Sequence, residues 1–340
     1  MIRRTFGSTG LSVSPIGMGT IQITRLEWKE SIRVIRKVME MGINWFDTAR
    51  SYLDSELRLG EALKGVRERV IIITKSGKKT SAELEQQINE SLQRLKTDYL
   101  DIFLFHGGEA LEEESFAQAG GLLETAQRAV KAGKIRFLGL SAHHPDQALK
   151  GLEYESMQAG MVPANFISRE YIDGAFMKRA REKNMAVMAM KPFGGGRIGN
   201  AQVCLKFLKS YPDLFPCIGI ERPEEMEQNL AVWEDGQGLT EADREELRRL
   251  TGLLGNRFCR SCGYCLPCPQ EIPIPTVTFL KVFARQMPPH EVWTEEHRKA
   301  VERARECTEC GQCVERCPYS LEIPEMLREN VRFYEESTSR

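Results

Sequence analysis

Eight cysteines near the end of the chain have a spacing that could bind metal. The chain has ten cysteines in 340 residues, and these eight lie within residues 259–317 in two arrays. The first array reads Cys-x2-Cys-x2-Cys-x2-Cys-Pro and the second Cys-x2-Cys-x2-Cys-x3-Cys-Pro. A tight Cys-x2-Cys-x2-Cys loop can place three thiolates on one iron–sulfur cubane, while a cysteine before proline reaches another cluster. The arrays therefore predict iron–sulfur chemistry on Cys259, Cys262, Cys265 and Cys268, and on Cys307, Cys310, Cys313 and Cys317.

Two alternatives stay open for these cysteines. Two zinc sites with four thiolates each would use the same eight residues, although zinc ribbons have paired Cys-x2-Cys knuckles rather than triplets. A single cluster is the other alternative, because Cys268 has one residue fewer before it than Cys317 has. Disulfides are less favoured, since we expect the chain in the reducing cytoplasm.

The two arrays resemble copies of one unit. Pro275 follows Cys268 by seven residues, and Pro324 follows Cys317 by the same interval. An isoleucine precedes each of these prolines. Because proline is favourable in the first turn of a helix, we expect a helix to begin at each one.

Polar residues end several apolar runs in the first 235 residues. They are Asp47, Lys75 and His106, followed later by Ser141, Asn165 and Lys191. In a parallel barrel the carboxyl ends of the strands form the active-site face, so these side chains would converge there. Tyr52 would join them from the loop after Asp47. His143 and His144 are expected on a solvated loop near the same mouth.

These residue types together could carry out carbonyl chemistry. A phenol, with an ordinary pKa near ~10, donates a proton at neutral pH only if its anion is stabilised. The ammonium of Lys75 would stabilise the Tyr52 anion, and Asp47 would hold that lysine charged and oriented. His106 could hydrogen-bond a substrate carbonyl while hydride arrives from a nicotinamide. The alternative for Tyr52 is an aromatic side chain that packs on the rim.

The elements that would position these groups alternate between short β-branched runs and amphipathic stretches. Thr80 and Glu83 form a capping-box pattern at the start of one such stretch. Eight strand and helix pairs predict an α/β fold, a (β/α)8 TIM barrel over residues 1–255. A doubly wound sheet is the rival, but no Gly-x-Gly-x-x-Gly follows an early strand. The expected strands are 16–20, 43–47, 70–75, 99–106, 135–141, 157–165, 185–191 and 215–220.

A hairpin is expected before the first strand of the barrel, where it would close the barrel floor. Residues 256–340 are expected to form a small α-helical ferredoxin-like iron–sulfur domain. The composition is 41% hydrophobic and 28% charged with a net charge of −1, as in soluble globular proteins. That charge predicts neither nucleic acid nor anionic membranes as partners. The start also lacks the apolar core of a signal peptide, so a cytoplasmic location is expected.

The sequence around the polar residues resembles the aldo-keto reductases over about residues 1–235. The resemblance rests on RTFGSTGL at 4–11, WFDTARSY at 45–52 with Ser55-Glu56, ITKS at 73–76, and SLQRL at 91–95 followed by DYLD at 98–101. It implies a (β/α)8 barrel with Asp47, Tyr52, Lys75 and His106 as the catalytic tetrad. It also implies a nicotinamide dinucleotide that binds extended, without a Rossmann fold.

The same resemblance implies the residues that contact the cofactor. They are Gly19, Thr20, Asp47, Ser141, Asn165, Lys191, Pro192, Phe193, Gly194, Gly195, Arg222, Gln228 and Asn229. Arg222 is the one obvious partner for a 2′-phosphate, so NADP(H) is expected, with NAD(H) as the alternative. The chain departs from the family at Ala142, Met161 and Met190. The glycine run 194–196 has a plain flexible loop as its alternative.

The tail resembles the iron–sulfur branch of the same family and the helical two-cluster ferredoxins. This implies two 4Fe-4S clusters with crossed ligands. One would take Cys259, Cys262, Cys265 and Cys317, and the other Cys307, Cys310, Cys313 and Cys268.

The leading hypothesis is an oxidoreductase that moves hydride between NAD(P)H and a small carbonyl or alcohol substrate. Its clusters would exchange electrons with a ferredoxin-like or flavodoxin-like partner, or serve as structural pins. A second hypothesis is a cluster-dependent one-electron reductase, suggested by the departures at Ala142, Met161 and Met190. A third is an electron carrier or sensor that uses the barrel as a binding scaffold, which an intact tetrad argues against.

Overall fold

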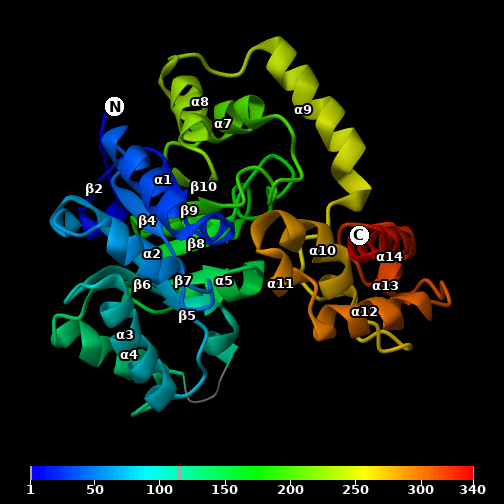
Figure 1. Cartoon of the computed structure of the whole chain (residues 1–340), viewed down its shortest axis with the longest axis horizontal. Coiled ribbons are helices and arrows are strands. Elements are labelled where there is room, and N and C mark those ends of the chain that lie inside the picture. The colour runs from blue at the N-terminus through cyan, green and yellow to red at the C-terminus, as the bar shows by residue number, and fades with distance from the viewer. Residues whose placement is uncertain (1, 113–115, 340) are drawn as a thin grey trace. The chain divides into compact units, whose positions relative to one another are not determined.

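The computed structural model describes residues 2–112 and 116–339 and divides into two compact units (Figure 1). One unit comprises Met1–Pro192 and Asn200–Gly238, and the other comprises Phe193–Gly199 and Leu239–Arg340. The expected domain boundary at residue 255 falls inside the second unit. A short loop from the middle of the chain also belongs to that second unit.

The first unit is built on a closed barrel of eight parallel strands, in the order β10-β3-β4-β5-β6-β7-β8-β9. Because neighbouring strands follow one another in sequence, this is the predicted (β/α)8 barrel and not the doubly wound sheet. The eight strands are β3 (Gly17–Gly19), β4 (Trp45–Asp47), β5 (Ile71–Ser76), β6 (Leu100–Gly107), β7 (Ile135–Ala142), β8 (Met157–Pro163), β9 (Ala186–Met190) and β10 (Leu214–Gly219).

Helices follow the strands and surround the barrel (Figure 1). They are α1 (Trp28–Glu40), α2 (Ser55–Ala62), α3 (Ser81–Leu95), α4 (Leu122–Lys131), α5 (Pro145–Gly151), α6 (Ala175–Glu182), α7 (Ala201–Lys209) and α8 (Pro223–Glu234). The predicted cap of α3 is present, since the Thr80 side chain accepts a hydrogen bond from the backbone N–H of Glu83. None of the helices in the described part of the chain is long and apolar enough to cross a membrane.

An antiparallel hairpin closes the amino-terminal end of the barrel, as expected. It pairs β1 (Arg4–Thr5) with β2 (Ser12–Val13). Phe6, fully buried, packs its ring against Phe215 at 4.6 Å and Trp45 at 5.7 Å between centroids. This apolar plug seals one end of the barrel, so a ligand has to enter from the other.

The second unit is helical. Its helices are α9 (Glu241–Leu254), α10 (Ile274–Gln286), α11 (Pro289–Val292), α12 (Glu295–Arg305), α13 (Gln312–Glu315) and α14 (Ile323–Thr338). Apolar residues of α10, α12 and α14 share one core with several of the cysteines. Pro275 and Pro324 stand in the first turns of α10 and α14, as the sequence predicts.

The backbone confirms that the two cysteine arrays are copies. Matched residues have the same left-handed φ values, 60° and 54° at Ser261 and Glu309, 79° and 81° at Gly263 and Gly311, and 53° and 48° at Glu271 and Ser320. The turns before the two helices also match, because the N–H to O distance is 2.8 Å both from Ile274 to Ile272 and from Ile323 to Leu321. The shorter spacing before Cys268 therefore does not disturb the duplicated fold.

Candidate active site and cluster sites

The four predicted catalytic side chains meet at the carboxyl ends of β4, β5 and β6. Asp47 is the last residue of β4, Lys75 the fifth residue of β5, and His106 the seventh of β6. The pairing of Asp47 with Ile73 and of Lys75 with Leu104 brings these three strand ends to one rim. The structure therefore places the predicted polar residues where the barrel argument expects them.

Lys75 and Asp47 form a buried ion pair. Lys75 Nζ lies 2.7 Å from Asp47 Oδ1 and 2.8 Å from Oδ2. The same ammonium donates to the Thr48 carbonyl at 2.7 Å. Since Lys75 is only 1% exposed and Asp47 4%, each charge depends on the other for its stability.

Tyr52 is held against this pair by the loop after β4. The Lys75 Nζ lies 4.7 Å from the centroid of the Tyr52 ring. The His106 ring stands nearly perpendicular to the Tyr52 ring, with 5.8 Å between centroids. The loop is fixed because the Arg50 N–H donates to the Lys75 carbonyl at 3.0 Å. Tyr52 therefore lies beside both Lys75 and His106.

Glu56 helps to hold this loop, although the sequence did not single it out as a site residue. It is fully buried, and Arg50 Nη1 lies 2.8 Å from its Oε2. The Thr74 hydroxyl donates to its Oε1 at 2.8 Å. The only signal for it in the sequence was its place within the Ser55-Glu56 part of the family resemblance.

Burial and charge set the protonation of the tetrad. Burial raises the pKa of Tyr52, and the nearby Lys75 ammonium lowers it without overcoming that effect. Burial also raises the pKa of Asp47 against the opposing effect of Lys75. Burial lowers the pKa of Lys75, but Asp47 and Tyr52 raise it more, so the net direction is upward. At neutral pH the phenol therefore keeps its proton and the lysine keeps its charge.

His106 and His143 are uncharged near neutral pH. Burial, together with the charges of Lys75 and Lys191, lowers the pKa of His106 to about 3. The charge of Lys191, followed by burial, lowers the pKa of His143 well below its usual value. His143 Nδ1 lies 3.4 Å from Lys191 Nζ, so it is half-buried among these groups rather than on a solvated loop.

Several of the residues expected to hold a nicotinamide share this rim. Gly19 pairs with Asp47 on one side and Gly219 on the other, and Ser141 pairs with His106. The Thr20 hydroxyl donates to the Asp47 carbonyl at 2.8 Å. These residues are therefore neighbours of the tetrad in the barrel wall.

Two further expected residues, Asn165 and Lys191, are tied to one another. Asn165 Nδ2 donates to the Lys191 carbonyl at 3.0 Å. Asn165 Oδ1 accepts from the N–H groups of Ile167 and Ser168, at 2.9 and 2.8 Å. In the structure this amide fixes the loops after β8 and β9.

The remaining expected contacts lie elsewhere. Arg222 caps α8 and pairs with Glu225 at 3.0 Å, while Gln228 on the same helix is exposed and Asn229 is buried. Pro192 is the last residue of the first unit before the loop of residues 193–199, and Phe193, Gly194 and Gly195 in that loop belong to the second unit. A Cβ on Gly194 would lie 2.7 Å from the Phe258 ring. The freedom of this glycine thus allows close packing within the second unit.

The rim also contains an acceptor that the sequence analysis missed. Gln22 Oε1 is buried and has no hydrogen-bond partner among the described residues. It lies beside Gly219, where a Cβ would come within 2.1 Å of it. Because a buried acceptor without a donor is costly, this oxygen suits an N–H or O–H group of a bound ligand.

The eight cysteines surround two cavities, with four cysteines at each. The first set, Cys259, Cys262, Cys265 and Cys317, lines one cavity. The second set, Cys268, Cys307, Cys310 and Cys313, lines the other. Both sets combine three cysteines of one array with the last cysteine of the other. This is the crossed arrangement that the resemblance to two-cluster ferredoxins implies.

The thiols of these cavities suit a cationic metal group. Within residues 2–112 and 116–339, no group of three or more Cys, His, Asp or Glu side chains converges as ligands of one metal ion. The neighbouring thiols oppose one another's ionisation, since burial and then Cys259 and Cys262 raise the pKa of Cys265 to about 12. Four such thiols need a cationic group at the centre of the cavity to become thiolates.

Comparison with known proteins agrees with both sites. A model of the aldo/keto reductase family matches residues 15–201, and one of a 4Fe-4S dicluster domain matches residues 258–322. The chain therefore belongs to the aldo/keto reductase family, and it is an oxidoreductase of that family with a 4Fe-4S dicluster domain at its carboxyl end. The second match favours iron–sulfur clusters over the zinc alternative.

Two curated relatives match part of the barrel. An uncharacterized oxidoreductase of Bacillus subtilis is 25% identical over 210 residues, covering 58% of this chain and 66% of its own. The 6-dehydroglucose reductase of Novosphingobium aromaticivorans is 28% identical over 221 residues, covering 58% of this chain and 71% of its own. The chain thus spans just under two thirds of the first relative.

Solved structures share the barrel fold. An aldo-keto reductase of Pseudomonas aeruginosa is 26% identical, with a TM-score of 0.61 over 68% of this chain and 94% of its own. An aldo/keto reductase of Klebsiella pneumoniae, solved with NADP and acetate, is 24% identical, with a TM-score of 0.61 over 74% of this chain and 95% of its own.

Proposed function

We propose that this protein moves hydride between NADP(H) and a small carbonyl or alcohol substrate, with Tyr52 as the general acid or base. The observation that carries this proposal is the buried Lys75–Asp47 ion pair beneath the Tyr52 ring. An isolated buried pair is costly and seldom retained for stability alone. Next to a buried phenol it has a chemical use, because it stabilises the phenolate.

Tyr52 supplies the proton in the direction of reduction. Its phenol is protonated at neutral pH, since burial raises its pKa. After it donates to the substrate oxygen, the nearby Lys75 ammonium stabilises the phenolate that is left. Asp47 keeps the ammonium charged and in place. In the direction of oxidation the same phenolate accepts the proton of the alcohol.

His106 orients the substrate. Because its pKa is lowered to about 3, the ring is a neutral donor and cannot itself deliver a proton as an imidazolium. Ser51 Oγ lies 3.4 Å from its Nδ1. The proton of the neutral ring can therefore sit on Nε2 and donate to the substrate oxygen.

The bound nicotinamide supplies or accepts the hydride at the substrate carbon. We propose the thirteen residues given above as its contacts, with Gln22 Oε1 as an additional acceptor. The Klebsiella pneumoniae protein, which shares the fold, was solved with NADP, so a barrel of this fold can hold such a dinucleotide. Arg222 remains the proposed partner of the 2′-phosphate.

We further propose two 4Fe-4S clusters, one on each set of four cysteines. The two cavities support this number, since each is lined by four thiols. The clusters would exchange single electrons with a ferredoxin-like or flavodoxin-like partner. The protein would act in the cytoplasm.

The test measures both binding and turnover on the full chain purified without oxygen. NADPH and NADH are titrated separately, followed by turnover with methylglyoxal, a small ketoaldehyde suggested by a methylglyoxal reductase of Escherichia coli that is 32% identical over 163 residues. Tyr52→Phe should lower kcat by at least about 10²-fold. The matched control is Tyr99→Phe, which removes a tyrosine hydroxyl just before the start of β6, at the end of that strand away from His106.

Unchanged turnover in Tyr52→Phe would reject the tetrad mechanism. The second candidate function, a one-electron reductase, is supported by the dicluster domain at residues 258–322. It predicts that turnover is insensitive to Tyr52→Phe and is lost when the cluster cysteines are replaced. The two candidate functions therefore predict opposite results for Tyr52→Phe.

A further inference from the structure

The duplication of the tail allows its two cluster cavities to be compared residue by residue. The backbones of the two arrays match in φ at three pairs of positions. Two clusters on identical copies would have equal surroundings, so any difference at matched positions reveals a difference in cluster chemistry. The potential of such a cluster depends on nearby charge and on hydrogen bonds to its sulfurs.

The first difference is a hydrogen-bond donor. Thr278 stands four residues after Ile274, and Leu327 stands four residues after Ile323. Thr278 Oγ1 lies 3.3 Å from Cys259 Sγ, within hydrogen-bond reach, and lines the cavity of the first set. It also lies 2.9 Å from the Ile274 carbonyl, but a charged sulfur is the stronger acceptor. Leu327 lines the second cavity and has no proton to donate.

The second difference is charge at the cavity wall. Among the described residues that line the first cavity, the one charged side chain is Arg260. Its guanidinium lies 3.6 Å from the centroid of the Tyr319 ring. In the second cavity the one charged lining residue is Glu309. Reduction adds a negative charge to a cluster, so Arg260 at the first wall favours it. Glu309 at the second wall is ion-paired with Arg328, and none of the described residues that line that wall is a cation that would favour reduction.

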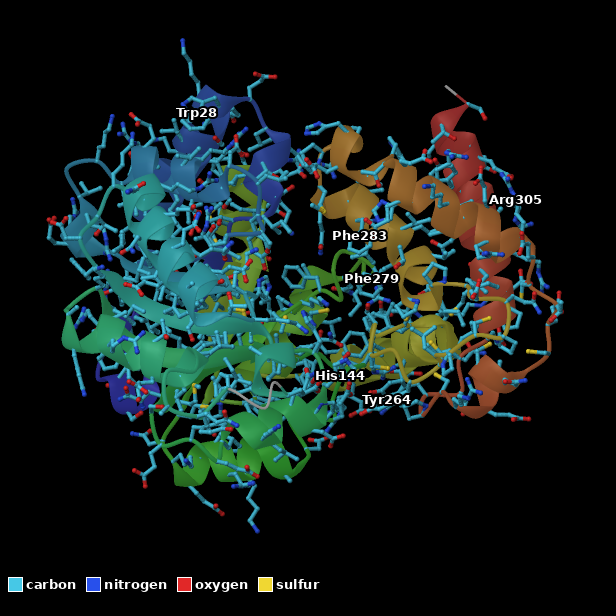
Figure 2. The ribbon with its side chains drawn as sticks, turned by 90° about the horizontal axis from the view of Figure 1, so that it is seen from below. Trp28, His144, Tyr264, Phe279, Phe283 and Arg305 are labelled. Atoms are coloured by element: carbon cyan, nitrogen blue, oxygen red, sulfur yellow. The ribbon has the colours of Figure 1, made fainter. Side chains whose placement is uncertain are left out.

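The third difference is a buried cation behind the first cavity. Arg197 lies in the loop Phe193–Gly199, which belongs to the same unit as the cysteines. Its Nη1 donates to the Cys259 carbonyl at 2.8 Å, and its Nε donates to the Gly194 carbonyl at 2.8 Å. Its guanidinium lies 3.5 Å from the Phe258 ring centroid and 5.2 Å from that of Phe279, which Figure 2 labels on α10. These contacts fix a positive charge beside one ligand of the first set.

Arg197 carries a full positive charge, because a guanidinium is not deprotonated in proteins. Cations near the second set include Arg328, which interacts with Cys307, and Arg316, which donates from Nη1 to the Pro267 carbonyl. Arg316 is exposed, unlike Arg197, so its charge is screened by water and salt. Arg328 is ion-paired with both Glu309 and Glu325, and its field at the second cavity is therefore weaker.

We propose that Thr278, Arg260 and Arg197 give the cluster of the first set the higher reduction potential, so that the first electron entering the tail resides there. The reasoning rests on the proposed pair of clusters. All three differences act in the same direction, because a donor and two cations stabilise the reduced form. The second set, with Leu327 and Glu309, holds the cluster that is reduced later.

The experiment is a redox titration with dithionite, followed by electron paramagnetic resonance, on the full chain purified without oxygen. Thr278→Leu should lower the higher midpoint potential and leave the lower one in place. The matched change Leu327→Thr should raise the lower potential and leave the higher one in place. Arg197→Met should also lower the higher potential, whereas Arg197→Lys, which keeps the charge, should retain most of it.

Iron analysis separates the two ways in which the experiment can fail. Markedly fewer than about eight irons per chain would reject the pair of clusters, and with it the proposed function of the tail. With about eight irons present, a Thr278→Leu shift in the lower potential, or no shift at all, would overturn the inference. If Thr278→Leu loses iron, Leu327→Thr and the Arg197 pair decide: an unchanged lower potential and equal potentials in Arg197→Met and Arg197→Lys would overturn it.

Discussion

Replacing Lys75 by methionine should destabilise the barrel and make its stability depend on pH in a new way. Lys75 Nζ has three close oxygen contacts, two with Asp47 at 2.7 and 2.8 Å and one with the Thr48 carbonyl at 2.7 Å. Methionine keeps most of the side-chain volume and removes the charge. The Asp47 carboxylate is then buried without its counter-charge.

The expected cost is about 3–5 kcal/mol, the usual penalty for breaking a buried ion pair from one side. Asp47→Asn alone leaves Lys75 unpaired and should cost a similar amount. The double variant has no buried charge and should recover most of the loss. The two single costs together are about 6–10 kcal/mol and the double variant costs little, so the coupling in a double-mutant cycle should exceed about 3 kcal/mol.

The pH dependence gives the sharper signature. Burial already raises the pKa of Asp47, and Lys75 is the group that opposes this rise. Without Lys75 the folded-state pKa of Asp47 rises further above its unfolded-state value. Between these two pKa values the folded protein binds more protons than the unfolded chain. The stability of the variant is therefore lost as pH rises through the folded-state pKa of Asp47. The deficit of Lys75→Met should be small near pH 4 and large at pH 8.

Equilibrium urea unfolding, followed by circular dichroism at several pH values, measures the free energy of unfolding of each variant. At pH 8 the midpoint of Lys75→Met should fall by about 1 M or more. The matched control is Arg67→Met, which removes a cation 2.7 Å from buried Asp101. Arg136 at 2.8 Å still pairs with Asp101, so this control should lose less. An unchanged midpoint in Lys75→Met, or an equal deficit at pH 4 and pH 8, would refute the reasoning.

Three further outcomes follow from the structure. His106 has its pKa lowered to about 3, so kcat/KM should show no ionisation of this residue near its ordinary value of about 6.5; a limb there that disappears in His106→Gln would contradict its neutral role. Cys268→Ala should remove about half of the iron bound per chain, whereas Cys204→Ala, at a buried cysteine outside both sets, should remove none. Gly219→Ala should weaken NADPH binding by about tenfold, because its Cβ would displace Gln22 at 2.1 Å; equal affinity by fluorescence titration would show that this glycine is not at the cofactor.

The sequence was informative about the barrel because each strand carries its own signal. Short β-branched runs ended in a polar residue, and in a parallel barrel all such ends face one way. Asp47, Lys75 and His106 could therefore be placed at one rim before any coordinates. Tyr52 was joined to them by its place in the loop after Asp47 and by its chemistry, and the family resemblance then implied its role, since a loop aromatic has no periodic pattern to locate it.

The sequence was less informative where a role depends on distant partners. The glycines after β9 resembled a ligand-binding loop, yet Gly194 packs against Phe258, more than sixty residues later. Gln22 gave no signal, because only the close approach of Gly219 reveals that its amide oxygen is buried without a donor. His143 was expected in solvent, since neighbouring histidines in a polar loop carry no mark of burial.

The cysteine arrays show why the two kinds of information are needed together. Spacing alone left Cys268 in doubt, because it compares the arrays only along the chain. The structure adds that Cys268 and Cys317, each followed by a matched turn at Glu271 and Ser320, line opposite cavities. Once the copies can be superposed in this way, their differences become meaningful: a threonine against a leucine at one position is unremarkable in a sequence, but beside a cluster sulfur it separates a donor from a group that cannot donate. The two arrays share one backbone framework, so the few side chains that differ between them are the ones that would tune each proposed cluster.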